Sequence, residues 1–569
     1  PRTPAARSHT HPLGMVAPSV IRAASAAEGA FGLRPQDLHN AYALPTEAPV
    51  PQTVAVVDAY NDPTIEADLA VYDREFRLPA CTASNGCLTT MNAAGQSGPL
   101  PAVNGEWAVE ISLDVETVHA TCQNCRILLV EAESNSDAAL EAAENRAVAA
   151  GATEISNSWG GPEPVADSAA YNHPGVAITA AAGDNGYLGW DAYEPAERGY
   201  ADYPASSPHV VAVGGTSLSV GPHGEWTGES VWNNAQGATG GGCSARFSAP
   251  PWQASLADWG TVGCGSLRAV ADVSAVADPY TGAAVYDSTP WDGYTLGWIT
   301  LGGTSLSAPI IAATFALAGG VRASTGYAAQ TLYEGALQHP SSLHDVTSGA
   351  SGQCTLSSGP TGASGCTPAQ ASASCGGQAI CLAGPGYDGP TGVGSPNGLQ
   401  VFLTTSSATS GTGVSGQRSG QGAGGGPNAA AESNAGTSPP PATTSESQPG
   451  SGTGPVAGEA AVTLSRLAFS RRARVALRRA HHPAVTFLFT ASAATPVRVT
   501  LAVLPRRAAR GSHARAARRA TTIESFSITA RRGHNAALLR NSGALARGLY
   551  VLTITPAQGR SQSTVVAVA

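Results

Sequence analysis

Two carboxyl side chains four residues apart carry the clearest chemical signal in this sequence. Glu110 and Asp114 lie in the segment Glu-Trp-Ala-Val-Glu-Ile-Ser-Leu-Asp-Val-Glu, and a helix over residues 106–120 would place both of them, with Glu106, on one stripe. Like charges at this spacing repel each other on an exposed helix. Because close carboxylates cannot both ionise easily, we expect one of the pair to hold a proton, as an acid or base catalyst requires.

Ser305 is the candidate nucleophile that this pair would serve. It stands in Gly-Gly-Thr-Ser-Leu-Ser-Ala-Pro, and the apolar run that follows is long enough for a buried helix. A serine at a helix N-terminus lies where the backbone dipole favours developing negative charge. A capping role is the commoner reason for a serine at such a place. The residues on either side of Ser305, Gly-Gly-Thr before it and Leu-Ser-Ala-Pro after it, favour the catalytic role over the capping role.

The elements that must position these side chains are short apolar strands and amphipathic helices. Nearly continuous apolar runs, separated by helical stretches such as residues 137–150, predict a buried parallel sheet with helices on both faces. We therefore expect a doubly wound α/β domain over residues 46–403, preceded by an extended leader at 1–45. The predicted strands are residues 53–58, 126–130, 152–159, 176–180 and 210–213.

The rest of the chain has a different composition. Residues 404–458 contain mostly Gly, Ser, Thr, Pro and Ala, too few large apolar groups to offset the entropy of ordering, so they predict a flexible linker. Alternating apolar residues return beyond it and predict a small all-β, sandwich-like accessory domain over residues 459–569. Its predicted strands include residues 484–490, 497–503, 522–529 and 549–555.

Charge separates the two predicted domains. The chain has no Lys, and from residue 460 onward it has 18 Arg against one acid, Glu524, whereas the preceding residues have 13 Arg and 39 acids. Such a basic domain would attract an anionic polymer, such as nucleic acid or a cell-surface teichoic acid. A solvated accessory domain and an ion-pair network with the acidic domain are open alternatives. We expect a monomer without a membrane span, since no run of about 18 apolar residues occurs.

Ten cysteines lie in the acidic part, several of them close together in Gly- and Ser-rich loops. This pattern is typical of local disulfides in an oxidising compartment, so we expect a secreted protein. The pair Cys122 and Cys125 leaves two alternatives open: a redox-active pair, or half of a zinc site. The ten are Cys81, Cys87, Cys122, Cys125, Cys243, Cys264, Cys354, Cys366, Cys375 and Cys381.

The string around Ser305 resembles the nucleophile motif of the subtilisin-like clan. The early strand at 53–58 and the late Gly-Thr-Ser follow the same order as in that clan. A subtilisin needs a histidine in a His-Gly-Thr helix, but His119 is followed by Ala-Thr. The corresponding helix has Glu110 and Asp114 instead. This substitution resembles the sedolisin family of serine-carboxyl peptidases, and the resemblance covers about residues 36–400.

The resemblance implies a role for each candidate residue. Ser305 would be the nucleophile, Glu110 its general base, and Asp114 the group that orients Glu110 and shares its proton. Asp184, in Ala-Ala-Ala-Gly-Asp-Asn-Gly, aligns with an oxyanion-site aspartate, which can donate a hydrogen bond only when protonated. A turn-forming role is the alternative for Asp184.

Two further residues belong to the same comparison. Trp159, in Ser-Asn-Ser-Trp-Gly-Gly, matches a tryptophan that extends the acid network in some sedolisins. Asp58 is either a further member of that network or the end of its strand.

A second group of residues resembles the calcium loop of the same family. Two aspartates and the carbonyls of a Gly-rich turn supply hard oxygen ligands in a flexible geometry, which suits Ca²⁺. Without the resemblance, Gly-Pro-Gly-Tyr-Asp-Gly would be interpreted as an ordinary loop. The implied ligands of one ion are the side chains of Asp345 and Asp388 and the carbonyls of Val346, Gly384 and Gly386.

The sequence thus predicts a secreted, acid-active serine-carboxyl peptidase that hydrolyses protein or peptide substrates, either as an endopeptidase or in a tripeptidyl mode. Two alternatives stay open. One is a subtilisin-type peptidase with His119 as the base. The other is a non-catalytic relative that binds an anionic surface polymer.

Overall fold

The structure is a computed structural model, and it describes most of the chain between residues 30 and 403 and the strands of the C-terminal part. The predicted linker at 404–458 lies outside the described residues. The described residues are 14–15, 22–24, 30–190, 192, 198–234, 236–257, 259–291, 296–320, 326–352, 375, 377–403, 464–469, 485–491, 495–503, 521–530, 533–539, 548–556 and 562–568.

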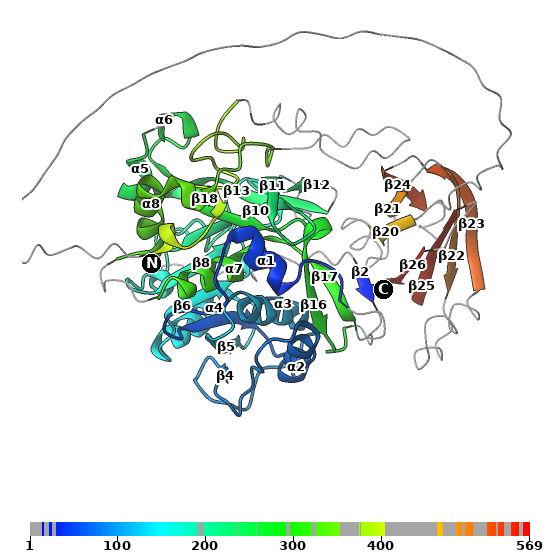
Figure 1. Cartoon of the computed structure of the whole chain (residues 1–569), viewed down its shortest axis with the longest axis horizontal. Coiled ribbons are helices and arrows are strands. Elements are labelled where there is room, and N and C mark those ends of the chain that lie inside the picture. The colour runs from blue at the N-terminus through cyan, green and yellow to red at the C-terminus, as the bar shows by residue number, and fades with distance from the viewer. Residues whose placement is uncertain are drawn as a thin grey trace, which may run out of the picture. The chain divides into compact units, whose positions relative to one another are not determined.

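A mostly parallel sheet forms the centre of the α/β domain (Figure 1). Within the described residues it has eight strands in the order β11-β10-β8-β6-β3-β5-β4, with β15 also pairing β10. Every neighbouring pair is parallel except β10 and β11. The strands are β3 (Thr53–Ala59), β4 (Leu88–Asn92), β5 (Arg126–Ala132), β6 (Glu154–Asn157), β8 (Ala177–Ala181), β10 (Val211–Val220), β11 (Trp226–Val231) and β15 (Val273–Val276).

Both faces of this sheet are buried, which explains the continuous apolar runs. Successive side chains of a strand point to opposite faces, and Val56 and Val57 of β3 accordingly join two different cores. The core on the Val56 side includes α3 (Gly105–Thr121) and α7 (Thr304–Leu317), and the other includes α4 (Asp137–Ala149). The prediction of a buried parallel sheet covered by helices on both faces is confirmed.

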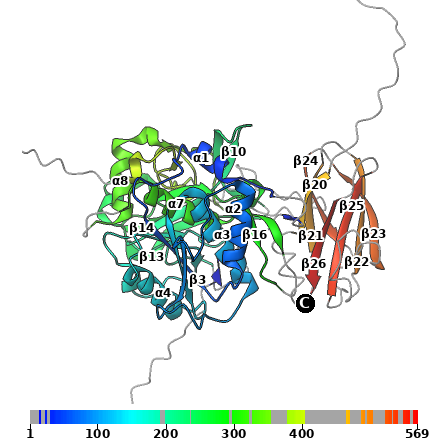
Figure 2. The same cartoon turned by 60° about the horizontal axis from the view of Figure 1, so that its bottom comes forward.

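Further elements surround the sheet, and α2 lies beside α3 in both views (Figure 2). None of the helices in the described part of the chain is both long and apolar enough to cross a membrane. The remaining helices are α1 (Pro35–Tyr42), α2 (Ile65–Phe76), α5 (Pro251–Ala254), α6 (Trp259–Val262) and α8 (Ala328–Gln338). The remaining strands of this domain are β1 (Gly14–Met15), β2 (Arg22–Ala24), β7 (Trp159–Gly160), β9 (Asn185–Tyr187), β12 (Asn233–Asn234), β13 (Gly237–Ser248), β14 (Leu267–Val270), β16 (Ala283–Asp287), β17 (Gly297–Leu301), β18 (Leu343–His344) and β19 (Ser395–Pro396).

The end of the segment predicted as an extended leader is structured. Here α1 spans Pro35–Tyr42, and Leu38 and Tyr42 are buried. The Tyr42 hydroxyl donates to Glu229 at 2.9 Å and accepts from the backbone N–H of Val276 at 2.8 Å, so it ties α1 to the sheet. The partners of Tyr42 lie far along the chain, and the spacing of apolar residues within 1–45 contains no sign of them. The sequence alone therefore predicts an extended leader there.

Four disulfides join described cysteines, and each closes a loop of the α/β domain. This agrees with the prediction of local disulfides, and in the described residues neither Cys122 nor Cys125 is a free thiol. Cys354 and Cys366 lie outside the described residues. The four pairs are Cys81–Cys87, Cys122–Cys125, Cys243–Cys264 and Cys375–Cys381.

An all-β accessory domain stays a prediction for the Arg-rich C-terminal part, whose described segments are β-strands. They make one sheet in the order β20-β21-β24 and a second in the order β23-β22-β25-β26, all antiparallel. In β22 the alternate residues Val497, Val499 and Leu501 are buried. A sandwich of these sheets stays a prediction. The strands are β20 (Leu464–Phe469), β21 (Val485–Ala491), β22 (Thr495–Val503), β23 (Thr521–Ala530), β24 (Gly533–Leu539), β25 (Gly548–Pro556) and β26 (Gln562–Val568).

Candidate active site

The paired carboxyls lie on α3, whose start is fixed by a side-chain cap. The Asn104 side chain accepts hydrogen bonds from the backbone N–H groups of Glu106 and Trp107, at 3.0 and 3.3 Å. One helical turn apart, Glu110 and Asp114 are both fully buried, whereas Glu106 on the same stripe is half-buried. The helix therefore carries two adjacent carboxyls into the interior.

Burial dominates the electrostatics of this pair. It raises the pKa of Glu110 well above its ordinary value, and the charges of Asp114 and Asp58 raise that pKa further. Hydrogen bonding from the Ser305 side chain acts in the opposite direction. The pKa of Asp114 is also raised well above its ordinary value, first by burial and then by the charge of Asp58. Such a pair retains protons into a pH range where ordinary carboxyls have lost them.

Ser305 is the second residue of α7 and is fully buried. The chain reaches it from β17 through Gly302 and Gly303, and Gly303 has a φ of 110°, in the region that favours glycine. Because α7 packs against α3 on the same face of the sheet, the candidate nucleophile and the candidate base come from two neighbouring helices. The influence of Ser305 on the pKa of Glu110 agrees with this placement.

Ser158 links the carboxyl pair to the nucleophile, and sequence reasoning did not single it out. It follows β6, and its hydroxyl donates to Oδ1 of Asp114 at 2.9 Å while lying 3.3 Å from the carbonyl oxygen of Ser305. The signal available in the sequence was its position just after a buried strand, where sites of parallel sheets gather.

Asp184 lies at the N-terminus of α7, beside Ser305. Its Oδ1 accepts hydrogen bonds from the backbone N–H and the hydroxyl of Thr304, at 2.8 and 3.0 Å, and the backbone N–H of Gly183 donates to the same hydroxyl at 3.0 Å. A Cβ on Gly303 would lie 2.6 Å from Oδ2 of Asp184. Glycine at 303 therefore permits both the backbone turn and the close approach of the carboxyl.

Asp58, at the end of β3, extends the carboxyl group. It is fully buried, burial raises its pKa to about 8, and neither of its carboxyl oxygens has a hydrogen-bond partner among the described residues. Trp159 is also buried, but its indole N–H donates to the backbone carbonyl of Val57 at 2.9 Å. Trp159 thus packs in the core on the α4 side of the sheet and is bonded to the backbone next to Asp58.

His119, the alternative base, is held in a different environment. It lies in the last turn of α3, and its Nε2 is 2.9 Å from the carbonyl oxygen of Pro79 and 3.1 Å from Oδ1 of Asp73. These neighbours belong to α2 and to the loop that follows it.

The residues of the predicted calcium loop come together in the structure. Backbone N–H groups of Gly386 and Gly384 donate to the carboxylates of Asp345, at 3.2 Å, and Asp388, at 3.0 Å. Burial raises the pKa of Asp388 to about 8, and the charge of Asp345 contributes to the rise. Two carboxylates close enough to repel each other fit a hard cation such as Ca²⁺.

Part of this chain is similar in sequence to known proteins. Residues 93–337 match the model of the subtilase family. Kumamolisin from Bacillus sp. (strain MN-32) is 35% identical over 311 residues, 52% of this chain and 50% of that protein. Sedolisin from Pseudomonas sp. (strain 101) is 32% identical over 274 residues, 44% of each. The chain spans about half the length of the curated relatives it matches.

A solved structure matches the α/β domain. Pseudomonas sedolisin, a serine-carboxyl proteinase complexed with pseudo-iodotyrostatin, has a TM-score of 0.50 and 27% identity, over 65% of this chain and 96% of that one. The fold is therefore a subtilisin-like α/β fold built on a parallel sheet, as predicted. Within that class, the resemblance of this chain to the sedolisin family is confirmed.

Proposed function

We propose that this chain is a secreted serine-carboxyl peptidase that hydrolyses peptide bonds in acid through an acyl-enzyme on Ser305. The observation that carries the proposal is the pair Glu110 and Asp114, fully buried on the helix that packs against the helix of Ser305. The chain keeps two carboxyls there at a cost in desolvation, which is difficult to explain by packing alone.

In the proposed first step, the Ser305 hydroxyl attacks the carbonyl carbon of the scissile bond. Its proton passes to Glu110, which must be ionised to accept it. Asp114 shares a proton with Glu110 and is oriented by the hydrogen bond from Ser158. When the intermediate collapses, Glu110 returns the proton to the leaving amine, and the acyl group stays on Ser305 until water removes it by the reverse sequence.

Asp184 would stabilise the oxyanion of the tetrahedral intermediate. Its Oδ1 already accepts two hydrogen bonds from Thr304, so a proton on Oδ2 would be the one available to the oxyanion. A carboxyl donates only in its protonated form, so activity would fall as pH rises and Asp184 ionises. This requirement, rather than the raised pKa of Glu110, supports an acid optimum, because Glu110 must be ionised to act as the base.

Calcium would bind the loop of Asp345 and Asp388, with the carbonyls of Val346, Gly384 and Gly386, and would supply charge compensation there. The side chains of this loop hold Gly384 and Gly386 in place and take no part in proton transfer.

Disulfides in the α/β domain favour an oxidising compartment and so support secretion. Binding of an anionic polymer by the Arg-rich part and a monomeric state stay predictions from composition.

The test is the pH profile of protein hydrolysis, from about pH 2.5 to about pH 9, for the wild type and Ser305→Ala in the presence of calcium. We expect a peak below about pH 5 and no hydrolysis by the variant. A peak near neutrality would contradict the carboxyl mechanism.

His119→Ala supplies the matched control for the choice of base. We expect His119→Ala to keep a peak of protein hydrolysis at acid pH, provided that the variant folds. If the variant loses turnover but still unfolds cooperatively, then His119, and not Glu110, is the base.

A further inference from the structure

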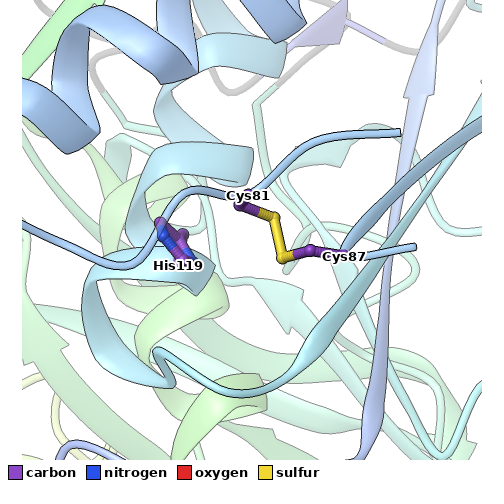
Figure 3. Close-up of side chains that lie close together, drawn as sticks. All are labelled: Cys81, Cys87 and His119. Carbon is purple, nitrogen blue, oxygen red and sulfur yellow. A yellow bond between two sulfur atoms is a disulfide. The ribbon is translucent and has the colours of Figure 1, made fainter. Parts of the chain in front are cut away.

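Two clusters of side chains that could ligate a metal lie outside the site described above within the described residues, and the one with a histidine is at the end of α3. The Cys81–Cys87 disulfide closes the loop between α2 and β4, and His119 approaches it from the last turn of α3 (Figure 3). One ligand atom from each of the three residues lies within 4.8 Å of the others. Cys81 and His119 are buried, and Cys87 is half-buried.

The hydrogen bonds of His119 determine which ring nitrogen carries the proton. Its Nε2 lies 2.9 Å from the carbonyl oxygen of Pro79, which can only accept, so Nε2 must be the donor. In the neutral ring, Nδ1 is then an acceptor with a free lone pair. Nδ1 has no hydrogen-bond partner among the described residues although the side chain is fully buried. A buried acceptor without a partner destabilises the fold, so a ligand that uses its lone pair would remove this cost.

A carboxylate lies beside two of the three residues and bonds to one of them. Oδ1 of Asp73 lies 3.1 Å from Nε2 of His119, and Oδ2 of Asp73 accepts the backbone N–H of Cys81 at 2.9 Å. Histidines that ligate metals almost always present their second ring nitrogen to a carboxylate or a carbonyl oxygen, and His119 lies beside both. The cluster thus has the outer support of a metal site as well as the ligand atoms.

We propose that Cys81, Cys87 and His119 form a zinc site when their disulfide is reduced. A thiol or phosphine reductant supplies two electrons, the sulfur–sulfur bond breaks, and each sulfur takes up a proton. Zn²⁺ then displaces both thiol protons and binds two thiolates and Nδ1, with water in the fourth position. The five residues between the cysteines, which include exposed residues 83–86, give the ion a route to the site.

The disulfide and the metal exclude each other in this arrangement, because each uses both sulfur atoms. An oxidising environment retains the disulfide, and a reducing environment near neutral pH favours the metal, which would close the same loop in its place. Acid removes the metal because thiolates and imidazole take up protons. Metal binding is therefore expected under reducing conditions near neutral pH, where the proposed peptidase is not active. The zinc proposal does not depend on the peptidase activity.

The test measures Co²⁺ and Zn²⁺ binding to the full chain, reduced with a phosphine near neutral pH. The matched control is the double variant Cys81→Ser with Cys87→Ser, which keeps the other eight cysteines. We expect the wild type to bind one more equivalent of metal than the control, with a stronger thiolate-to-cobalt absorption band. Equal binding by the two proteins overturns the proposal, and so does unfolding of the reduced wild type in excess Zn²⁺.

Two further variants separate a metal site from a packing role. Asp73→Asn should retain the thiolate-to-cobalt band but weaken Zn²⁺ binding by about 10–100-fold, the usual effect of removing an outer carboxylate. His119→Gln should weaken binding at least as much and change the band, because one ligand is lost. If both variants bind as the wild type does, His119 is no ligand and the proposal fails.

Discussion

Replacing Asp58 with Asn tests the electrostatic account of the buried carboxyls. Asp58 has a pKa of about 8 in the folded chain against 3.8 for an unburied aspartate, and burial is the cause. The folded state therefore holds its proton longer than the unfolded state does. Under linkage, the stability associated with Asp58 is complete below about pH 4 and is lost as pH rises towards about 8. Asn cannot ionise, so the variant should lack this loss.

The expected effect follows from the size of that shift. At about 1.4 kcal/mol per pKa unit, ionisation of Asp58 in the unfolded chain, while the folded chain keeps the proton, removes on the order of 4 kcal/mol of stability between about pH 4 and about pH 7. That amount is a large fraction of the stability of an ordinary domain. Between about pH 4 and about pH 7, Asp58→Asn should therefore lose about 4 kcal/mol less stability than its parent.

The assay is urea-induced unfolding at the two pH values, in a Ser305→Ala background that prevents self-digestion and at constant calcium concentration. Glu144→Gln is the matched control, since burial also raises the pKa of Glu144 to about 8, but Glu144 lies on α4 in the other core. Both variants should flatten the pH dependence of stability, and only Asp58→Asn should also shift the pH profile of activity. Stability curves for Asp58→Asn that run parallel to those of its parent would refute the reasoning.

Four further predictions concern the site and the calcium loop. Glu110→Gln should reduce turnover by about 10²–10⁴-fold with little change in unfolding; turnover within threefold of wild type would exclude Glu110 as the base. Asp184→Ala should lower kcat by about 10²–10³-fold, measured with saturating peptide, whereas an unchanged kcat would exclude an oxyanion role. Gly303→Ala should lower both turnover and stability, because its Cβ would meet Asp184 and its φ is 110°; normal values for both would contradict the packing described. Chelation should lower the Tm of the wild type but not that of Asp388→Asn, and equal shifts would place the ion elsewhere.

The strands and the carboxyl pair could be predicted because their signals are local. The runs at 53–58 and 126–130 are buried on both faces of a parallel sheet, so they are apolar throughout. Glu110 and Asp114 share one face of α3 because four residues are about one helical turn. In each case the spacing within a short segment contains the information.

Other features depend on contacts between distant segments. Ser158 bonds to Asp114 only because the strand order places the end of β6 beside α3 and α7. The orientation of His119 depends on Asp73 and Pro79, and α1 is held by partners of Tyr42 far along the chain. No periodicity within a segment records such pairings, so the sequence could not reveal them.

The burial of α7 also determines when the proposed site can exist. Every residue of this helix is buried, and it packs against α3 and several strands of the central sheet. During synthesis, Glu110 emerges from the ribosome long before Ser305, and α7 cannot be buried as described until the strands it packs against have also been made. A growing chain therefore carries the base without the nucleophile, and only the completed domain could cut its neighbours or itself.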